Sequence, residues 1–207
     1  MKRVLVENIN TVAHWNDELV TGKYDHFKID DFKKQLIANY VTNNSAIVDF
    51  GCGNGHVLKY LFNLYSNVKC VGIDHASEMM KKLNYETPVI TWLDVDIYNT
   101  GLKNFDYALC NEFLEHIEEP EKCIKEMARV LRDGGKLIGT TPLQNIVDSR
   151  EHIWSFEYED IKRMMDGYFK QSFVFPFSSR AMIIDTATGN TISPAGSWDT
   201  ILFLAIK

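Results

Sequence analysis

Acidic and imidazole side chains gather at the end of one predicted strand. Glu112 and Glu115 stand three residues apart, and His116 follows directly after Glu115. Residues three and four apart share one face of a helical turn, so these side chains can converge on the mouth of a cleft. The unperturbed pKa of an imidazole suits the removal of a proton from a hydroxyl. His116 is therefore a candidate general base, unless Glu115 and His116 only cap and pack the turn.

A glycine cluster between two acids forms a second group. Asp49-Phe50-Gly51-Cys52-Gly53-Asn54-Gly55 lies between a predicted strand and a predicted helix. In an open α/β sheet this is the edge where ligands bind. Glycines let the backbone turn sharply and approach a ligand closely. Asp74 stands 19 residues past Gly55, at the end of the next strand, where an acid can bind ribose hydroxyls.

The glycine spacing separates two kinds of cofactor. Dinucleotide-binding loops follow GxGxxG, whose third glycine allows close packing around a pyrophosphate. The spacing here is GxGxG, and Asp49 precedes the first glycine by two residues. An acid at that place would repel a pyrophosphate, whereas it suits a ligand with a cationic end, such as an amino acid moiety.

Alternating strands and helices must position these groups. Residues 1–44 are predicted as a helical lead-in, with a helix over 30–40. Alternation of this kind implies a parallel sheet with helices on both faces. The predicted strands are 46–50, 70–74, 88–93, 105–110, 136–141, 172–177 and 200–206, and the later helices are 55–66, 77–83, 121–131 and 158–166.

With these pieces in order, the chain resembles the class I S-adenosylmethionine-dependent methyltransferases over about residues 45–142. The segments that carry the resemblance are Val48–Gly55, Gly72–Asp74, Asp96–Ile97, Phe105–His116 and Val130–Leu137. It implies an α/β, Rossmann-like, seven-stranded sheet, mostly parallel with the last strand antiparallel. We expect a single domain over 1–207: a lead-in (1–44), a cofactor-binding core (45–142), and acceptor-side and C-terminal strands (143–207).

The resemblance also implies roles in cofactor binding. Gly51, Gly53 and Gly55 would pass under the methionine part of S-adenosylmethionine, which Asp49 would help to hold. Asp74 would bind the ribose hydroxyls.

Other implied contacts lie around the adenine and the reactive methyl group. His75 would lie near the adenine. Asp96 would accept the adenine amino group and Ile97 would supply a backbone contact, with Asp94 as the alternative to Asp96. Asn111 stands beside the methyl group, and the candidates for closing the pocket are Trp15 and Tyr24.

A metal site is implied by a narrower resemblance. Two glutamates in an ExxEH pattern with a later histidine are similar to the metal-dependent small-RNA 2′-O-methyltransferases and the ubiquinone-pathway O-methyltransferases. The ligands here would be Glu112, Glu115, His116 and His152, and His152 would also belong to the catalytic set with Glu112 and His116. Such ligands suit manganese, iron, cobalt or zinc better than calcium. A bound divalent ion would lower the pKa of an acceptor hydroxyl and orient it.

Charge and cysteine usage limit the partners. Lys and Arg number 22 against 28 Asp and Glu, a net charge of −6, so we expect no binding to duplex nucleic acid. The four cysteines form no CxxC pair, which favours buried thiols in a reducing compartment. The first apolar run is too short for a signal peptide, and none approaches the roughly 20 residues of a membrane span. A cytoplasmic location is expected.

The expected reaction is methyl transfer from S-adenosylmethionine to a hydroxyl of a small molecule or sugar-like acceptor, including a vicinal diol on a sugar or catechol. Three alternatives stay open: an N-methyltransferase on a small amine, a nucleotide-cofactor oxidoreductase, and a non-catalytic cofactor-binding partner subunit. The GxGxG spacing and the presence of Asp96 disfavour the oxidoreductase hypothesis.

Overall fold

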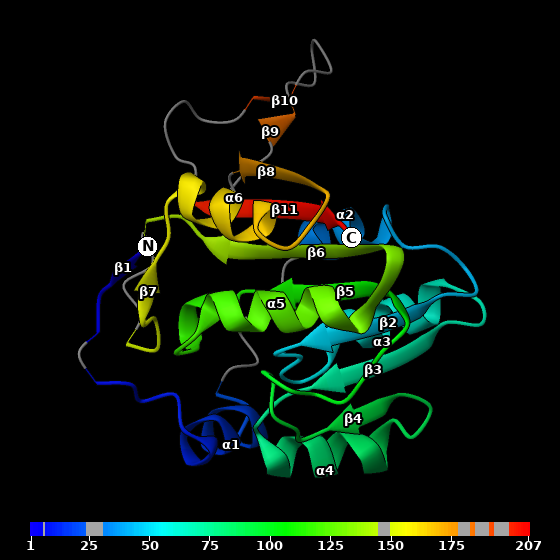
Figure 1. The fold of residues 1–207 in the computed structure, drawn as a ribbon. Helices are drawn as coiled ribbons and strands as arrows, with labels where there is room; N and C mark the ends of the chain where they lie inside the picture. Colours follow the sequence, from blue (N-terminus) through cyan, green and yellow to red (C-terminus); the bar gives the residue numbers. More distant parts are fainter. Residues whose placement is uncertain (6, 24–30, 145–149, 178–182, 185–190, 193–198) are drawn as a thin grey trace.

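The computed structural model describes residues 1–5, 7–23, 31–144, 150–177, 183–184, 191–192 and 199–207 (Figure 1). Tyr24, one of the candidates for closing the pocket, lies outside these residues. In the described part of the chain, no helix combines the length and apolar character that crossing a bilayer requires.

A seven-stranded sheet forms the centre of the molecule. Its order is β4-β3-β2-β5-β6-β11-β8. Strands β2 to β6 pair in parallel, and β11 runs antiparallel to both of its neighbours, β6 and β8. This confirms the predicted mixed sheet. The bounds are β2 (Ala46–Phe50), β3 (Lys69–Ile73), β4 (Thr91–Leu93), β5 (Phe105–Asn111), β6 (Leu131–Pro142), β8 (Gln171–Phe177) and β11 (Thr200–Ile206).

Helices cover both faces of this sheet, as predicted. One core cluster joins α5 (Pro120–Val130) and α6 (Tyr158–Asp166) to the sheet. The second joins the opposite face to α1 (Val12–Val20), α2 (Asp31–Ala38), α3 (His56–Leu64) and α4 (Ser77–Glu86). Strand β2 shows the division, because Val48 and Phe50 belong to the first cluster and Ile47 to the second. Strands buried on both faces must be apolar almost throughout, which explains the continuous runs in the sequence.

The lead-in is not helical throughout, which corrects the prediction for 1–44. Strand β1 (Lys2–Arg3) pairs antiparallel with β7 (Trp154–Ser155). The Arg3 guanidinium donates to both carboxylate oxygens of Glu118 at 2.6 and 3.0 Å. Pairing partners this distant in the chain leave no periodicity in the local sequence. The minor hairpin β9 (Ile183–Ile184) and β10 (Thr191–Ile192) completes the described strands.

Two boundaries differ from the prediction for local reasons. The strand predicted from residue 88 begins at Thr91, because the Ile90 N–H donates to the Thr87 carbonyl and closes a turn first. The strand predicted from residue 136 begins at Leu131, which pairs with Phe105 before a bulge shifts the register.

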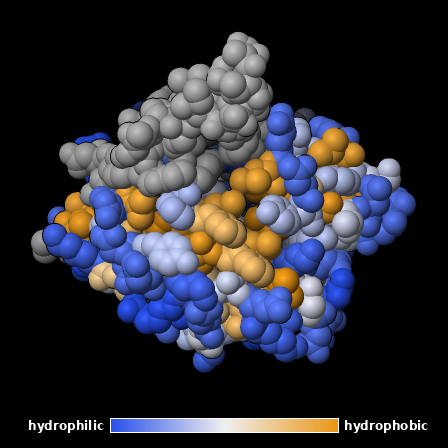
Figure 2. Space-filling model, turned by 90° about the horizontal axis from the view of Figure 1, so that it is seen from above, coloured by the Kyte–Doolittle hydropathy of each residue, from blue (hydrophilic) through white to orange (hydrophobic). Residues whose placement is uncertain are grey.

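The surface over the β8 side of the sheet is partly apolar. Seen from above, hydrophobic residues lie among hydrophilic ones on this face (Figure 2). On the outermost strand, β8, Phe173 and Phe175 are about half exposed.

Close packing between β6 and its neighbours predicts a sensitive position at Gly139. A Cβ atom there would overlap the Cys110 carbonyl oxygen and the Phe203 ring. We expect Gly139→Ala to destabilise the protein by about 3 kcal/mol, a fall in Tm of roughly 5–10 °C. Gly167→Ala is the control, because its Cβ would meet only ordinary contacts. Equal melting temperatures for the two variants in a calorimetric scan would contradict the packing described.

Candidate active site

An open cleft lies at the carboxyl ends of β2, β3 and β5. The predicted residues that line it are Trp15, Asp49, Gly51, Gly53, Asp74, His75, Asn111, Glu112 and His116. The residues of the glycine loop, the candidate ribose ligand and the candidate general base come from separate segments of the chain. All of them line this one cleft.

The glycine loop follows β2 with a left-handed backbone. Gly51 and Gly55 have φ values of +70° and +74°, which side-chain-bearing residues rarely adopt. A Cβ at Gly51 would overlap the Phe113 ring, and one at Gly55 the Trp92 ring. Gly55 lies against Trp92 and is absent from the cleft lining, so its predicted contact with the cofactor stays a prediction.

Asp74 fixes the loop as well as lining the cleft. One carboxylate oxygen accepts from the Gly53 N–H at 2.9 Å and the other from the Ala76 N–H at 2.9 Å. The loop is further tied to β3 by the N–H groups of Gly51 and Cys52, which both donate to the Ile73 carbonyl. The sequence predicted a ribose ligand at Asp74; the anchoring role was missed.

Asp49 is a buried carboxyl at the floor of the cleft, with 3% of its surface exposed. Burial, followed by the nearby charge of Asp74, raises the pKa of Asp49 to about 7. A cationic ligand group bound beside Asp49 would favour its charged form. The electrostatics of the floor thus fit the amino acid moiety that the sequence suggested.

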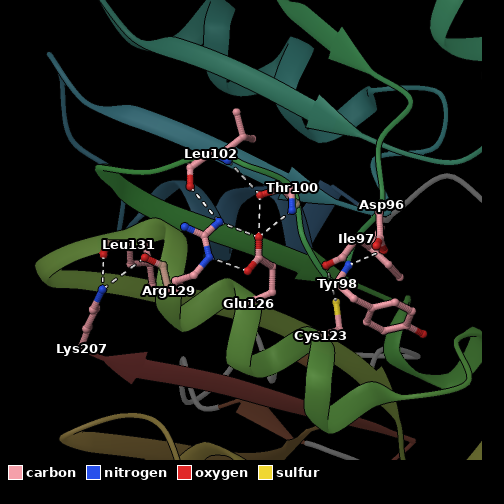
Figure 3. A network of polar contacts seen from close by, with 10 residues as sticks. All are labelled: Asp96, Ile97, Tyr98, Thr100, Leu102, Cys123, Glu126, Arg129, Leu131 and Lys207. Atoms are coloured by element: carbon pink, nitrogen blue, oxygen red, sulfur yellow. Dashed lines mark hydrogen bonds and ion pairs between the residues drawn. The ribbon is translucent and has the colours of Figure 1, made fainter.

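The segment after β4 is held in place from helix α5 (Figure 3). Cys123, Glu126 and Arg129 recur every three residues and so share one side of α5. The Cys123 thiol donates to the Ile97 carbonyl at 3.9 Å, and an Arg129 nitrogen donates to the Leu102 carbonyl at 2.9 Å.

Glu126 makes the central contacts of this network. Its carboxylate accepts from both the N–H and the hydroxyl of Thr100 at 2.7 Å and from Arg129. Asp96 accepts from the Tyr98 N–H and is exposed, outside the cleft lining. The adenine contacts of Asp96 and Ile97 therefore stay predictions.

Three of the four predicted metal ligands come together behind the cleft. The turn Leu114–His116 follows β5, and one ligand atom from each of Glu115, His116 and His152 lies within 4.8 Å of the others. All three residues are buried. The rings of His116 and His152 meet edge to face, with centroids 5.0 Å apart. The narrower resemblance had named these three residues together with Glu112.

Hydrogen bonds fix the donor and acceptor atoms of this group. His116 Nδ1 lies 3.0 Å from the Glu151 carbonyl, which can only accept, so Nδ1 carries the proton and Nε2 has a free lone pair. Nε2 in turn lies 3.7 Å from Glu115 Oε1. Glu115 Oε2 accepts from the Thr141 hydroxyl at 3.0 Å, whereas buried Oε1 has no hydrogen-bond partner among the described residues.

Burial sets the charge of both groups. It lowers the pKa of His116 to about 3, with His152 as the next cause. Burial, followed by the charge of Glu112, raises the pKa of Glu115 well above its usual range. His116 is therefore neutral at physiological pH, and Glu115 holds a proton much more readily than an exposed glutamate would.

Glu112 stands apart from this group. Its carboxylate lines the cleft and pairs with the ammonium of Lys33, from α2, at 3.0 Å. Glu112 also has a φ of +48°, a left-handed conformation that costs a non-glycine residue of order 1–3 kcal/mol. The predicted set of four thus divides into three converging ligands and one residue held by a lysine. Lys33 was missed, because a lysine in an amphipathic helix has no distinguishing local pattern.

Trp15 lines the cleft beside His116, and its predicted role in closing the cofactor pocket stays a prediction. Its ring meets that of His116 edge to face at 5.3 Å. The neighbouring His14 lies with Nε2 3.6 Å from a Glu151 carboxylate oxygen. Glu151 therefore contacts His14 through its side chain and His116 through its carbonyl, a link that the sequence did not indicate.

Comparisons with known proteins agree with this site. A family model described as a methyltransferase domain matches residues 48–139. A ubiquinone biosynthesis O-methyltransferase of Hydrogenovibrio crunogenus is 29% identical over 150 residues, 68% of this chain and 61% of that protein. One of Coxiella burnetii is 28% identical over 108 residues, 48% and 44% of the two chains. The matched stretches thus span about half the length of these curated relatives.

A solved structure shares the fold across nearly the whole chain. It is a chain of the complex between the Haloferax volcanii Trm112 methyltransferase activator and a methyltransferase, with a TM-score of 0.73 and 16% identity. The similarity covers 98% of this chain and 99% of that one. At this identity the likeness shows the fold alone.

The pKa of Asp49 predicts a pH-dependent affinity for S-adenosylhomocysteine. Only the charged carboxylate attracts the ligand's ammonium, so binding below about pH 7 must release the Asp49 proton. We expect affinity measured by calorimetry to be about tenfold weaker at about pH 6 than at about pH 8. Asp49→Asn should bind weakly and without this slope; an unchanged slope in the variant would assign the proton to another group.

The contacts of Glu126 predict an effect on the adenine end of the ligand. Glu126→Ala removes both bonds to Thr100. If the 96–102 segment contacts adenine, affinity for S-adenosylhomocysteine should fall about tenfold. Affinity for S-ribosylhomocysteine, which has no adenine, should change less than about twofold. The matched control is Glu119→Ala, which disrupts an exposed ion pair with Lys122 at the start of the same helix. Equal losses for both ligands would argue against adenine positioning.

Proposed function

Because the chain belongs to the class I S-adenosylmethionine-dependent methyltransferases, we propose that it transfers a methyl group from S-adenosylmethionine to a hydroxyl of a small molecule. The observation that carries the choice of a hydroxyl is the unprotonated Nε2 of neutral His116, at the cleft wall and 3.7 Å from buried Glu115. Relatives named as O-methyltransferases support the same choice.

In this proposal the cleft floor binds the cofactor. Asp49 balances the ammonium of the methionine part, and Asp74 binds the ribose while holding the loop through Gly53. Asn111 lines the cleft, and both polar atoms of its side chain are buried without hydrogen-bond partners among the described residues. Such unsatisfied atoms are costly unless a ligand supplies the partner, which supports the role of Asn111 near the reactive group.

The transfer itself is an in-line displacement. The acceptor oxygen forms a bond to the methyl carbon while the carbon–sulfur bond breaks, and its electron pair stays on sulfur. The hydroxyl proton passes to Nε2 of His116, which lies 3.7 Å from Oε1 of Glu115. The Trp15 ring packs edge to face against the His116 ring.

The same donor atoms fit a divalent cation. Glu115 Oε1 is unpartnered among the described residues, His116 Nε2 offers a lone pair, and His152 completes the group. The outer contacts also fit, because the Glu151 carbonyl orients His116 and Thr141 orients Glu115. With a zinc-, manganese-, iron- or cobalt-like ion bound, Glu115, His116 and His152 would hold it, and Nε2 of His116 would be a metal ligand instead of the base. The ion would then supply a lower pKa for an acceptor hydroxyl. A vicinal diol on a sugar or catechol is the acceptor that best suits it.

His116 distinguishes hydroxyl from amine acceptors. We expect His116→Gln to lower turnover of a hydroxyl acceptor at least about 100-fold, as loss of a general base does, with S-adenosylhomocysteine affinity unchanged within about twofold. A neutral amine needs little help from a base and should lose less than about tenfold. The assay is mass-spectrometric detection of methylated product from catechol, a sugar diol and a small amine.

Two results would count against the proposal. Methylation of the amine alone would favour an N-methyltransferase. Full activity of His116→Gln on a hydroxyl acceptor would show that the His116–Glu115 pair does not receive the proton.

A further inference from the structure

Lys33 is a buried cation beside the proposed acceptor site. It lies on α2, with 7% of its surface exposed, and its ammonium is 3.0 Å from Glu112 Oε1. Glu112 is part of the cleft wall, and its side chain is about one-third exposed. The lysine and the glutamate are 79 residues apart in the chain, so the fold itself brings this charge to the cleft.

Glu112 lies outside the group of three converging ligands but lines the same cleft as His116. The group within 4.8 Å comprises Glu115, His116 and His152. The left-handed backbone at Glu112 and the bond from its N–H to the Thr140 carbonyl at 2.9 Å fix the position of this residue.

We propose that Lys33 competes with a divalent metal ion for Glu112, and so limits the protein ligands of the ion to Glu115, His116 and His152. The ammonium balances the Glu112 carboxylate as a metal ion would. An ion recruits Glu112 only where that ammonium is removed. This proposal rests on the cation of the proposed function and assigns a role to Lys33 within it.

The competition would matter for the acceptor. A catalytic metal site characteristically has three protein ligands and leaves coordination positions open for water or substrate. A fourth protein ligand would occupy a position that a diol acceptor needs for its second oxygen. Lys33 would thereby act as a positioning residue, because it contacts Glu112 and leaves the acceptor's place free.

A double-mutant cycle tests the competition with Co²⁺ as the only added ion. Calorimetry gives the affinity, and visible absorption of bound Co²⁺ reports the number of ligands. The variants are Lys33→Met, Glu112→Gln and the two combined. Lys34→Met is the matched control, because it removes the same charge from α2, where Lys34 lies over the Tyr60 ring. Thermal shifts with S-adenosylhomocysteine verify that each variant is folded.

The two single changes should depend on each other. Lys33→Met should bind Co²⁺ at least about tenfold more tightly than the natural chain, with a changed absorption spectrum. Glu112→Gln should weaken binding less than about threefold when Lys33 is present, and at least about tenfold when Met replaces it. Lys34→Met should behave like the natural chain.

Other outcomes would contradict the competition, the position of the ion or the binding of any ion, and each outcome can be told apart from the others. Additive effects, or no gain in Lys33→Met, would reject the competition while leaving the three-ligand site. Binding that survives His152→Ala would place the ion elsewhere and reject it too. If Co²⁺ binds to none of the variants, the competition and the proposed cation both fail, whereas methyl transfer is judged separately by the His116→Gln assay.

Discussion

The position of the whole cleft depends on the carboxylate of Asp74. It accepts one hydrogen bond from the glycine loop after β2 and one from the start of α4, and thus joins two crossover connections at the sheet edge. Backbone N–H groups of a left-handed loop need such an acceptor, because their geometry excludes regular pairing. The same carboxylate, through its charge, contributes to the high pKa of Asp49. Asp74 therefore determines both the shape of the glycine loop and part of the shift in the pKa of Asp49.

Burial is the second constraint, and it makes the chemistry of the cleft depend on ligands. Asp49, on β2, and Glu115 and His116, in the turn after β5, are each buried away from water. Their charged forms are disfavoured until an opposite charge arrives. An ammonium beside Asp49, or a cation or proton shared between Glu115 and His116, would supply it. The buried Asp49, Glu115 and His116 therefore depend on a ligand, a metal ion or a proton for the opposite charge, because the apolar core supplies none.

The sequence could predict the parts of the site that local spacing encodes. The glycine loop with its flanking acids and the turn carrying Glu115 and His116 each occupy a few consecutive residues, and alternation of strands and helices brings them to one edge. The narrower resemblance named His152 as a ligand, and the structure brings it beside Glu115 and His116. The methyltransferase resemblance followed from these pieces in order.

What the sequence could not predict depends on contacts between distant segments. Lys33 reaches Glu112 across 79 residues, and β1 pairs with β7 from the opposite end of the domain. Neither leaves a periodic pattern, because each involves one or two residues whose types are common on any surface. The anchoring of the glycine loop by Asp74 was missed for another reason: acceptors of backbone hydrogen bonds have no sequence signature of their own.

The antiparallel insertion of β11 between β6 and β8 has a consequence for how such a protein can diversify. Because Thr200 pairs with both Pro142 and Phe177, the connection between β8 and β11 leaves and re-enters the sheet at the edge that holds the cleft. The closure entropy of a connection grows slowly, by about 0.6 kcal/mol for each doubling of its length. Insertions between these two strands could therefore accumulate in evolution at small thermodynamic cost. New acceptor preferences could arise there while the glycine loop, Asp49 and Asp74 remain unaltered.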